Sequence, residues 1–288
     1  MNRLQLWDEA AETFRHRWLP FFMPMGLTFT SLIAANSRAT YSALMKRLSE
    51  YLSCGTYNDG DFRILKSDLW NESIDGSKGN LREFVSNLPF GLETFGGDIS
   101  PKVCRLASRK RIIDNIVCFD VMCLPFRSNS LDIVFDLSTI DHVEPSSTQT
   151  VIKEYSRVLR SGGLLLLTFD SPSILSKLQR AISRMIAPDR GKLGYAPYHW
   201  LIHPIIMRNI LKEYYGIISE YSLLPEHGIL MLLQRMFTKV NNQRLRIGPS
   251  SWRFMFTLLQ NFRRFELSRC SKHMEVLAFQ YVFLCVRA

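Results

Sequence analysis

The chain has 288 residues, of which 47% are hydrophobic and 22% charged, and its formal net charge is +10. This length suits one sizeable domain with additions, because domains commonly contain about 100 to 200 residues. The apolar content is enough for a large core and excludes an intrinsically disordered, collagen-like or low-complexity chain.

The first 58 residues are expected to form a helical cap in front of the core. Their apolar stretch, 18–35, contains two prolines and a glycine and follows three acidic residues. A signal peptide would begin with basic residues, and a membrane-spanning helix would need about 20 uninterrupted apolar residues. We therefore expect neither, and predict a cytoplasmic protein for which contact with a membrane surface stays open.

A core is predicted over residues 59–225. From about residue 61 to residue 173, short β-rich runs alternate with longer helical ones, which is the pattern of a parallel sheet covered on both faces. The first of these helices begins with Ser100 as N-cap and Pro101 at its first position. The second ends before Gly162, because a glycine can adopt the left-handed conformation that closes a helix. Strands are expected at 63–67, 92–98, 115–119, 131–137, 164–169 and 217–223, and helices at 101–110 and 146–160.

A basic segment, 226–273, is expected as an insert between the strand at 217–223 and a last strand in 274–288. The insert has nine basic residues against two acidic ones, a net charge of +7. Two apolar stripes within it, at 229–237 and 254–262, predict amphipathic helices. Charge alone does not choose among nucleic acid, anionic lipid and an acidic partner.

The six cysteines are spread thinly, without a CxxC pair or a Cys/His cluster at zinc-ligand spacing. We expect reduced thiols and no metal site. The sequence GGDISP (96–101) offers a different chemistry, because it follows a predicted strand at the edge where open α/β sheets bind ligands. Asp98 could accept two hydrogen bonds from a ribose diol, or it could simply stabilise the start of the next helix.

Four further motifs follow in order: FDVMCLPF (119–126), SLDIVFD (130–136), STIDHV (138–143) and EYSRVLRSGGL (154–164). Together, over about residues 96–173, they resemble the class I S-adenosylmethionine-dependent methyltransferases of the small-molecule, ubiquinone-biosynthesis-like type. The resemblance implies an α/β fold with a Rossmann-like, seven-stranded, mostly parallel sheet and helices on both faces.

The resemblance also implies a site for S-adenosylmethionine, which leaves as S-adenosylhomocysteine. Asp98 would hold the ribose hydroxyls, with Gly96 and Gly97 allowing close approach of the backbone. Asp120 would accept a hydrogen bond from the adenine amino group. The remaining contacts would come from Ile99, Val121, Asp136, Leu137 and Ser138.

The first motif departs from the family pattern. A glycine-rich loop D-x-G-x-G-x-G usually follows the first strand, so that backbone amides meet the methionine carboxylate. This chain reads ILKSDLWNESIDGSKG (64–79) instead. In one interpretation, Asp68 or Glu72 contacts the cofactor ammonium and residues 76–79 form a shifted turn. In the other, the pocket no longer binds the cofactor.

Methyl transfer from a sulfonium needs little acid–base machinery, because alignment of the reacting atoms supplies much of the acceleration. His142 is the candidate general base, with Asp141 to orient it, although a histidine at this turn could equally pack the loop. Tyr195, Tyr198 and His199 could line the acceptor pocket, or form an aromatic loop packed on the sheet edge.

Three functions are therefore kept. The first is methyl transfer, by direct in-line displacement, to a small, apolar or lipid-like acceptor, with the insert 226–273 as part of the roof and in peripheral contact with an anionic membrane. The second is RNA methylation through the basic insert, which is disfavoured because no separate RNA-binding module is recognisable. The third is a non-catalytic scaffold that kept the sheet.

Overall fold

The computed structural model describes residue 8 and residues 29–54, 62–75, 81, 85, 91–111, 113–174, 176–178, 181, 199–223, 248–267 and 276–288. Tyr195, Tyr198, the turn predicted at 76–79 and the helix predicted at 229–237 lie outside these described residues.

One seven-stranded sheet forms the centre of the molecule. Its strands are β1 (Phe62–Lys66), β2 (Leu92–Asp98), β3 (Asn115–Cys118), β4 (Leu131–Leu137), β5 (Leu159–Asp170), β6 (Tyr215–Leu223) and β7 (Gln280–Arg287). The strand order is β3-β2-β1-β4-β5-β7-β6. Neighbours from β3 to β5 pair in parallel, whereas β7 is antiparallel to both β5 and β6. The predicted seven-stranded, mostly parallel sheet is confirmed.

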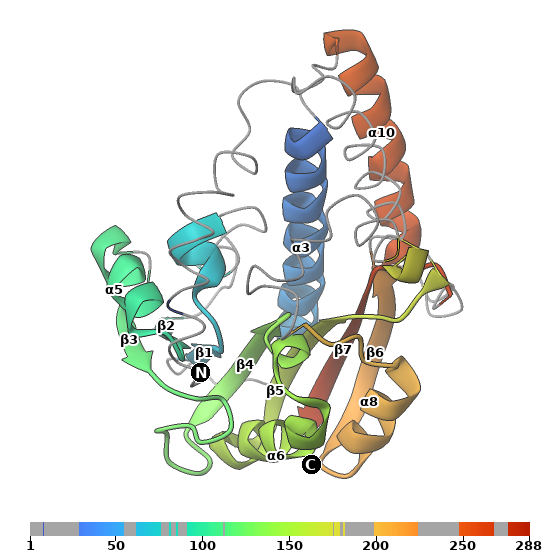
Figure 1. The fold of residues 1–288 in the computed structure, drawn as a ribbon. Helices are drawn as coiled ribbons and strands as arrows, with labels where there is room; N and C mark the ends of the chain where they lie inside the picture. Colours follow the sequence, from blue (N-terminus) through green and yellow to red (C-terminus); the bar gives the residue numbers. More distant parts are fainter. Residues whose placement is uncertain are drawn as a thin grey trace.

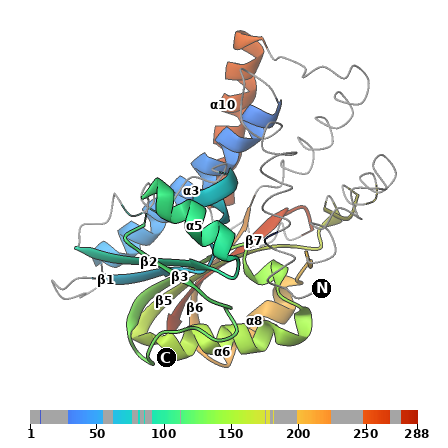
Figure 2. The same cartoon turned by 60° about the vertical axis from the view of Figure 1, so that its left-hand side comes forward.

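Helices cover both faces of this sheet. They are α3 (Phe29–Cys54), α5 (Pro101–Lys110), α6 (Thr148–Val158), α8 (Pro204–Lys212) and α10 (Pro249–Glu266), with the short helices η2 (Asn71–Asp75), η3 (Ile140–His142) and η4 (Pro145–Ser147). Figures 1 and 2 show α3 and α5 on one face and α6 and α8 on the other. No helix among the residues described is long and apolar enough to cross a membrane.

The central strands are buried on both faces, so each contributes to two hydrophobic cores. In β4, Ile133 and Phe135 belong to the core beneath α3 and α5, whereas Val134 belongs to the core beneath α6 and α8. This division follows from the alternation of side chains along a strand. It also explains why β4 reads as a continuous apolar run broken by only two acidic residues.

The N-terminal region supplies the long helix α3, whose residues Tyr41, Leu44 and Leu48 are buried in the first of these cores. Helix α10 lies beside α3 in both views and provides the second helix predicted for the insert (Figures 1 and 2). Asp8 accepts hydrogen bonds from the Ser100 hydroxyl and the Lys102 amide, at the start of α5. The division of the chain into cap, core and insert stays a prediction.

The predicted boundary between α6 and β5 is wrong. Helix α6 ends at Val158, two residues early, and β5 begins at Leu159 and not at residue 164. The reason is long-range, because Leu131 pairs with Leu159 before the register between β4 and β5 shifts. Gly162 has a φ of 75°, as predicted for a left-handed glycine, but it lies within this irregular start of β5.

Candidate functional site

The carboxyl ends of β1, β2, β4 and β5 meet at one edge of the sheet, because these strands are parallel. In the described part of this edge, acidic side chains outnumber basic ones. The acidic residues are Asp68, Glu72, Asp98, Asp120, Asp136, Asp141 and Asp170, and the basic groups facing them are Lys66, His142 and His199. The edge is therefore suited to a positively charged ligand.

Asp98 ends β2 and directs its carboxylate toward the loop after β1. Its Oδ2 accepts a hydrogen bond from the Leu69 amide at 3.2 Å, and its Oδ1 accepts one from the Ser100 amide at 2.9 Å. Burial raises the pKa of Asp98 to about 7, although these two hydrogen bonds act in the opposite direction. Each carboxylate oxygen retains a lone pair, so the group can still accept from a diol.

Gly96 and Gly97 have a packing role that the sequence did not indicate. A Cβ atom on Gly97 would lie 1.9 Å from the Phe119 ring, and one on Gly96 would lie 2.6 Å from Leu69. The space beside both glycines is therefore filled by protein side chains. The neighbours on this side are Phe119, Leu69 and Ile113, and the predicted close approach of the backbone to a cofactor stays a prediction.

The next turn places Asp120 beside the same edge. Asp120 is half-buried, and its Oδ1 accepts a hydrogen bond from the Met122 amide at 3.0 Å. Ile99, on the preceding loop, is also partly exposed, whereas Val121 is buried in the core beneath α6 and α8. A partly exposed carboxylate and a partly exposed apolar side chain at the same edge of the sheet suit a planar heterocycle with an amino group.

The end of β4 is organised by Asp136, which is fully buried. Its Oδ1 accepts from the amides of Thr139 and Ile140 at 2.7 and 3.2 Å, and its Oδ2 accepts from the Tyr155 hydroxyl at 2.9 Å. Burial raises the pKa of Asp136 to about 7. Because its carboxylate is used internally, only Ser138 among the residues predicted here offers a side chain to a ligand.

Ser138 has a φ of 70°, which is unusual for a residue other than glycine. Its hydroxyl accepts a hydrogen bond from Gln280 Nε2 at 2.9 Å. Strained backbone at the carboxyl end of a strand persists only where the surroundings hold it, and it concentrates at functional sites.

The loop after β1 contains a buried group of charges in place of glycines. Lys66 is fully buried, and its Nζ lies 3.1 Å from Asp68 Oδ2 and 3.2 Å from Glu72 Oε2. Burial alone would lower the pKa of Lys66, but the two carboxylates outweigh it and raise this pKa. Asp68 remains partly exposed and also accepts from Thr139 Oγ1 at 2.9 Å.

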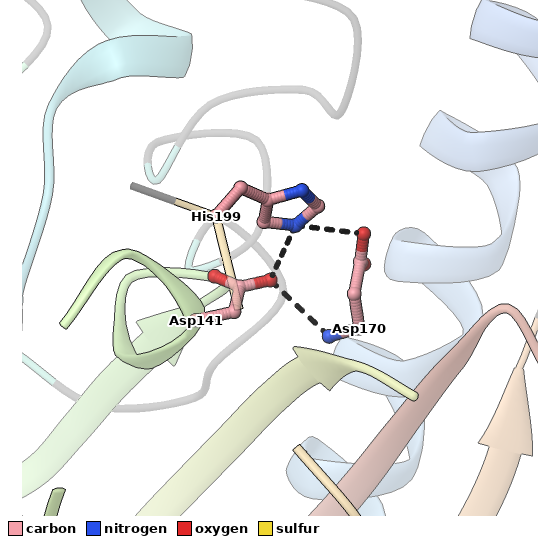
Figure 3. Close-up of side chains that lie close together, drawn as sticks. All are labelled: Asp141, Asp170 and His199. Carbon is pink, nitrogen blue, oxygen red and sulfur yellow. Dashed lines mark hydrogen bonds and ion pairs between the residues drawn. The ribbon is translucent and has the colours of Figure 1, made fainter. Parts of the chain in front are cut away.

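At the carboxyl ends of β4 and β5, His199 lies between two carboxylates (Figure 3). Its Nε2 is 3.0 Å from Asp170 Oδ2 and 3.5 Å from Asp141 Oδ2. Burial opposes the charged imidazolium, but hydrogen bonds and charge from Asp141 and Asp170 raise the pKa of His199 to about 10. His142 packs its ring against His199, with ring centroids 5.1 Å apart.

Main-chain bonds hold this group together. The Trp200 amide donates to the Asp141 carbonyl at 2.7 Å, and the Ile202 amide donates to the Asp170 carbonyl at 3.1 Å. Consequently the segment that follows His199 is tied to the ends of both β4 and β5. The predicted residues Asp141, His142 and His199 are thus brought together.

Several residues of the site were missed by sequence reasoning. Asp170 ends β5, and the strand-end rule that singled out Asp98 applies to it equally. Gln280 connects Asp170 Oδ1, at 3.0 Å, with Ser138 and with the Tyr41 hydroxyl at 2.8 Å. Tyr41 and Gln280 come from opposite ends of the chain, and no local pattern identifies them.

The chain is similar in sequence to known methyltransferases. The sequence profile of the methyltransferase domain family matches residues 76–167. Malonyl-[acyl-carrier protein] O-methyltransferase 1 from Coxiella burnetii is 27% identical over 175 residues, which cover 58% of this chain and 57% of that protein. The match therefore spans little more than half the length of this curated relative.

Two solved structures resemble the fold. One is a protein assigned as a sarcosine dimethylglycine methyltransferase from Galdieria sulphuraria, with a TM-score of 0.53, 15% identity and coverage of 85% of this chain and 86% of that one. The other is a geranyl diphosphate methyltransferase in complex with S-adenosylmethionine, with a TM-score of 0.50, 13% identity and coverage of 86% and 85%. At such identities the likeness concerns the fold alone.

Proposed function

The chain belongs to the class I S-adenosylmethionine-dependent methyltransferases, and from this premise we propose that it methylates a small, apolar acceptor at the carboxyl edge of its sheet. The observation that carries the proposal is the division of this edge into two halves. Asp98 and Asp120 stand at the ends of β2 and β3, where a nucleoside would bind. The histidines His142 and His199 stand at the β4 and β5 ends, where an acceptor would approach.

The residues present fit the nucleoside part of the cofactor. Asp98 would hold the ribose hydroxyls, and Asp120 would accept from the adenine amino group beside Ile99. When bound, S-adenosylmethionine supplies a methyl group on a positively charged sulfonium. The surplus of carboxylates at this edge favours such a cation.

The methionine part would be held differently from the family pattern. The Leu69 and Trp70 amides, which replace part of the glycine-rich loop, already donate to Asp98 and Asp68. Asp68 keeps 17% of its side chain exposed, whereas the Glu72 side chain is fully buried against Lys66. We therefore assign the cofactor ammonium to Asp68 and a supporting role to Glu72.

His142 is the proposed proton acceptor of the reaction. It is partly exposed at the turn after β4, and its Nε2 lies 3.9 Å from Asp141 Oδ1. An acceptor that is methylated would lose one proton, and His142 would take that proton. In-line placement of the reacting atoms supplies the main acceleration.

An apolar acceptor is supported by exposed side chains next to this half of the edge. Ile174, which follows β5, is 60% exposed, and Val276, which precedes β7, is 57% exposed. The two segments are joined by a hydrogen bond from the Ile174 amide to the Val276 carbonyl at 2.9 Å. Leu178, Leu277 and Trp200 are exposed as well. Such a concentration of exposed apolar side chains indicates a binding surface.

Titration calorimetry with S-adenosylmethionine and S-adenosylhomocysteine tests the cofactor assignment. Asp98→Asn should weaken binding about 10- to 100-fold, since a hydrogen bond to a charged group contributes about 1.5 to 3 kcal/mol. Asp114→Asn is the matched control, because Asp114 is exposed at the opposite end of β3. Absence of binding to folded wild-type protein would establish the scaffold alternative.

Detection of a methylated product in a screen of apolar alcohols, carboxylates and amines tests the acceptor assignment. His142→Ala should lower turnover while leaving the affinity for S-adenosylmethionine within twofold. Unchanged turnover in this variant would show that His142 only packs the loop.

We also propose that the protein works in the cytoplasm, in peripheral contact with an anionic membrane. The described cysteines, Cys104, Cys118, Cys123 and Cys285, are free thiols, as expected in a reducing compartment. On α10, Phe254 is 71% exposed and Leu258 is 47% exposed, one helical turn apart. They lie within the insert of net charge +7, and apolar and basic groups together favour a membrane surface.

Sedimentation with lipid vesicles tests the membrane contact. Anionic vesicles should bind the wild-type protein, and Phe254→Ala with Leu258→Ala should reduce binding. Ile205→Ala with Ile206→Ala is the control, because these side chains are similarly exposed on α8, away from the insert. Equal loss in both double variants, or no binding, would contradict the proposal.

A further inference from the structure

We propose that Asp141, Asp170 and His199 form a binding site for a divalent transition-metal ion. The sequence predicted no metal site, because these residues come from three separate segments at no ligand spacing. Binding of the ion is independent of methyl transfer. Its effect on an acceptor, in contrast, rests on the proposed function.

The ligand atoms have the separations of a coordination sphere. His199 Nε2 is 3.0 Å from Asp170 Oδ2 and 3.5 Å from Asp141 Oδ2, and one ligand atom of each residue lies within 4.8 Å of the others. Ligands about 2.0 to 2.1 Å from a tetrahedral ion lie about 3.3 to 3.4 Å apart. An ion among these atoms therefore needs only small side-chain adjustments.

The two buried carboxylates favour a doubly charged ion over a single proton. Asp141 and Asp170 are 1% and 6% exposed, so two negative charges are buried together. A divalent ion with a neutral imidazole would carry a charge equal and opposite to that of the two carboxylates, whereas a protonated His199 carries a single positive charge. Uncompensated buried charge is costly, which favours the ion.

A second observation in favour of a bound ion concerns the Asp141 carboxylate. Its Oδ1 is buried and accepts no hydrogen bond from the residues that the structure describes. His142 Nε2 is 3.9 Å from this oxygen, which is beyond hydrogen-bond distance. Oδ2 is the oxygen that faces His199, so an ion that this carboxylate binds through both oxygens would contact the buried Oδ1 as well.

Outer contacts hold the three ligands in place. Gln280 donates to Asp170 Oδ1 at 3.0 Å, and the Asp170 amide donates to Asp141 Oδ2 at 3.2 Å. The main-chain bonds of Trp200 and Ile202 fix His199 against both strand ends. Such outer-shell partners are characteristic of metal sites, where they orient the ligands.

One imidazole and two carboxylates select the kind of ion. Imidazole favours zinc and similar transition metals over magnesium and calcium, which prefer oxygen ligands only. Three protein ligands leave a fourth position open, as in sites where zinc acts on a substrate. At the acceptor half of the edge, this position would be available to an acceptor oxygen.

Calorimetric titration of chelator-treated, full-length protein with Zn²⁺ tests the site, and Mg²⁺ is the comparison ion. One Zn²⁺ should bind per chain, and His199→Ala or Asp170→Asn should weaken binding about 100-fold, since loss of an outer partner alone costs about 10- to 100-fold. His203→Ala is the matched control, because this exposed histidine only caps α8. Absence of one-equivalent binding, or equal losses in His203→Ala and His199→Ala, would overturn the proposal.

A second measurement needs no variant that could fail to fold. Co²⁺ added to the wild-type protein should give a visible absorption band that Zn²⁺ abolishes, whereas an unchanged spectrum of hydrated Co²⁺ would refute the site. Titration of the same metal-free protein with S-adenosylmethionine separates the two proposals. Cofactor binding without Zn²⁺ binding overturns only the metal site, and the reverse overturns only the proposed function.

Discussion

Replacement of Lys66 by methionine tests whether the buried charges after β1 stabilise the fold. Lys66 is fully buried, and its ammonium contacts the carboxylates of Asp68 and Glu72 at 3.1 and 3.2 Å. It also donates to the Asp68 carbonyl at 2.6 Å. Methionine has nearly the same length and no charge, so Lys66→Met removes these contacts with little change in volume.

The expected loss of stability in Lys66→Met depends on the carboxylate charge that stays buried. Removing one partner of a buried ion pair typically costs about 3 to 5 kcal/mol, because the other charge stays buried without compensation. The side chain of Glu72 is fully buried, whereas that of Asp68 is 17% exposed and keeps its hydrogen bond from Thr139. Most of the loss should therefore come from Glu72, and the double variant Lys66→Met with Glu72→Gln should recover about 2 kcal/mol or more.

Urea unfolding followed by circular dichroism at pH 7 measures these differences. Lys153→Met is the control, because Lys153 is exposed on α6, and it should change the free energy of unfolding by no more than about 0.5 kcal/mol. If Lys66→Met lies within about 1 kcal/mol of the wild-type protein, or if the double variant is less stable than Lys66→Met, the reasoning is refuted.

Three further predictions concern stability. Asp98 has a folded pKa of about 7, above its ordinary value of 3.8, so its contribution to stability is lost as pH rises through 7. Between pH 5 and pH 8 the free energy of unfolding should fall less in Asp98→Asn than in the wild-type protein, and equal falls in urea titrations would contradict this. Tyr155→Phe leaves buried Asp136 without one donor and should cost about 1 to 3 kcal/mol in urea unfolding, whereas a loss below about 0.5 kcal/mol would exclude a stabilising hydrogen bond. Gly97→Ala should cost about 1 to 3 kcal/mol, because its Cβ would lie 1.9 Å from the Phe119 ring. The combined variant with Phe119→Ala should lose less than the sum of the two single losses, and additive losses would argue against this contact.

Much of the fold could be predicted because local patterns report burial directly. The bounds of β2 and β4 and those of α5 agree with the prediction, since each has an apolar period and a clear start or stop signal. Ser100 accepts a hydrogen bond from the Val103 amide as the expected N-cap. The start of β5 was wrong because it depends on pairing with Leu131, which no local pattern contains.

Residues of the candidate site were predictable only where their position at the end of a predicted strand identified them. Residues that follow strands, such as Asp98 and Asp141, were identified because parallel strands end at the same edge. For Gly97 the structure adds a packing role that was not predicted, because the side chain that fills the space beside it belongs to the next strand end. Asp136 turned inward, to the Tyr155 hydroxyl, and this orientation follows from the packing of α6 on the sheet.

The sequence by itself determined the class of fold, the order of its strands along the chain and the family, because hydrophobic period and motif order are properties of short segments. Tertiary structure alone decided which charges meet. Lys66 contacts Glu72 because of the turn at η2, and His199 contacts Asp141 and Asp170 at the ends of two strands. Such meetings depend on register and on the direction of each side chain, and these are set only when the whole sheet and its covering helices pack.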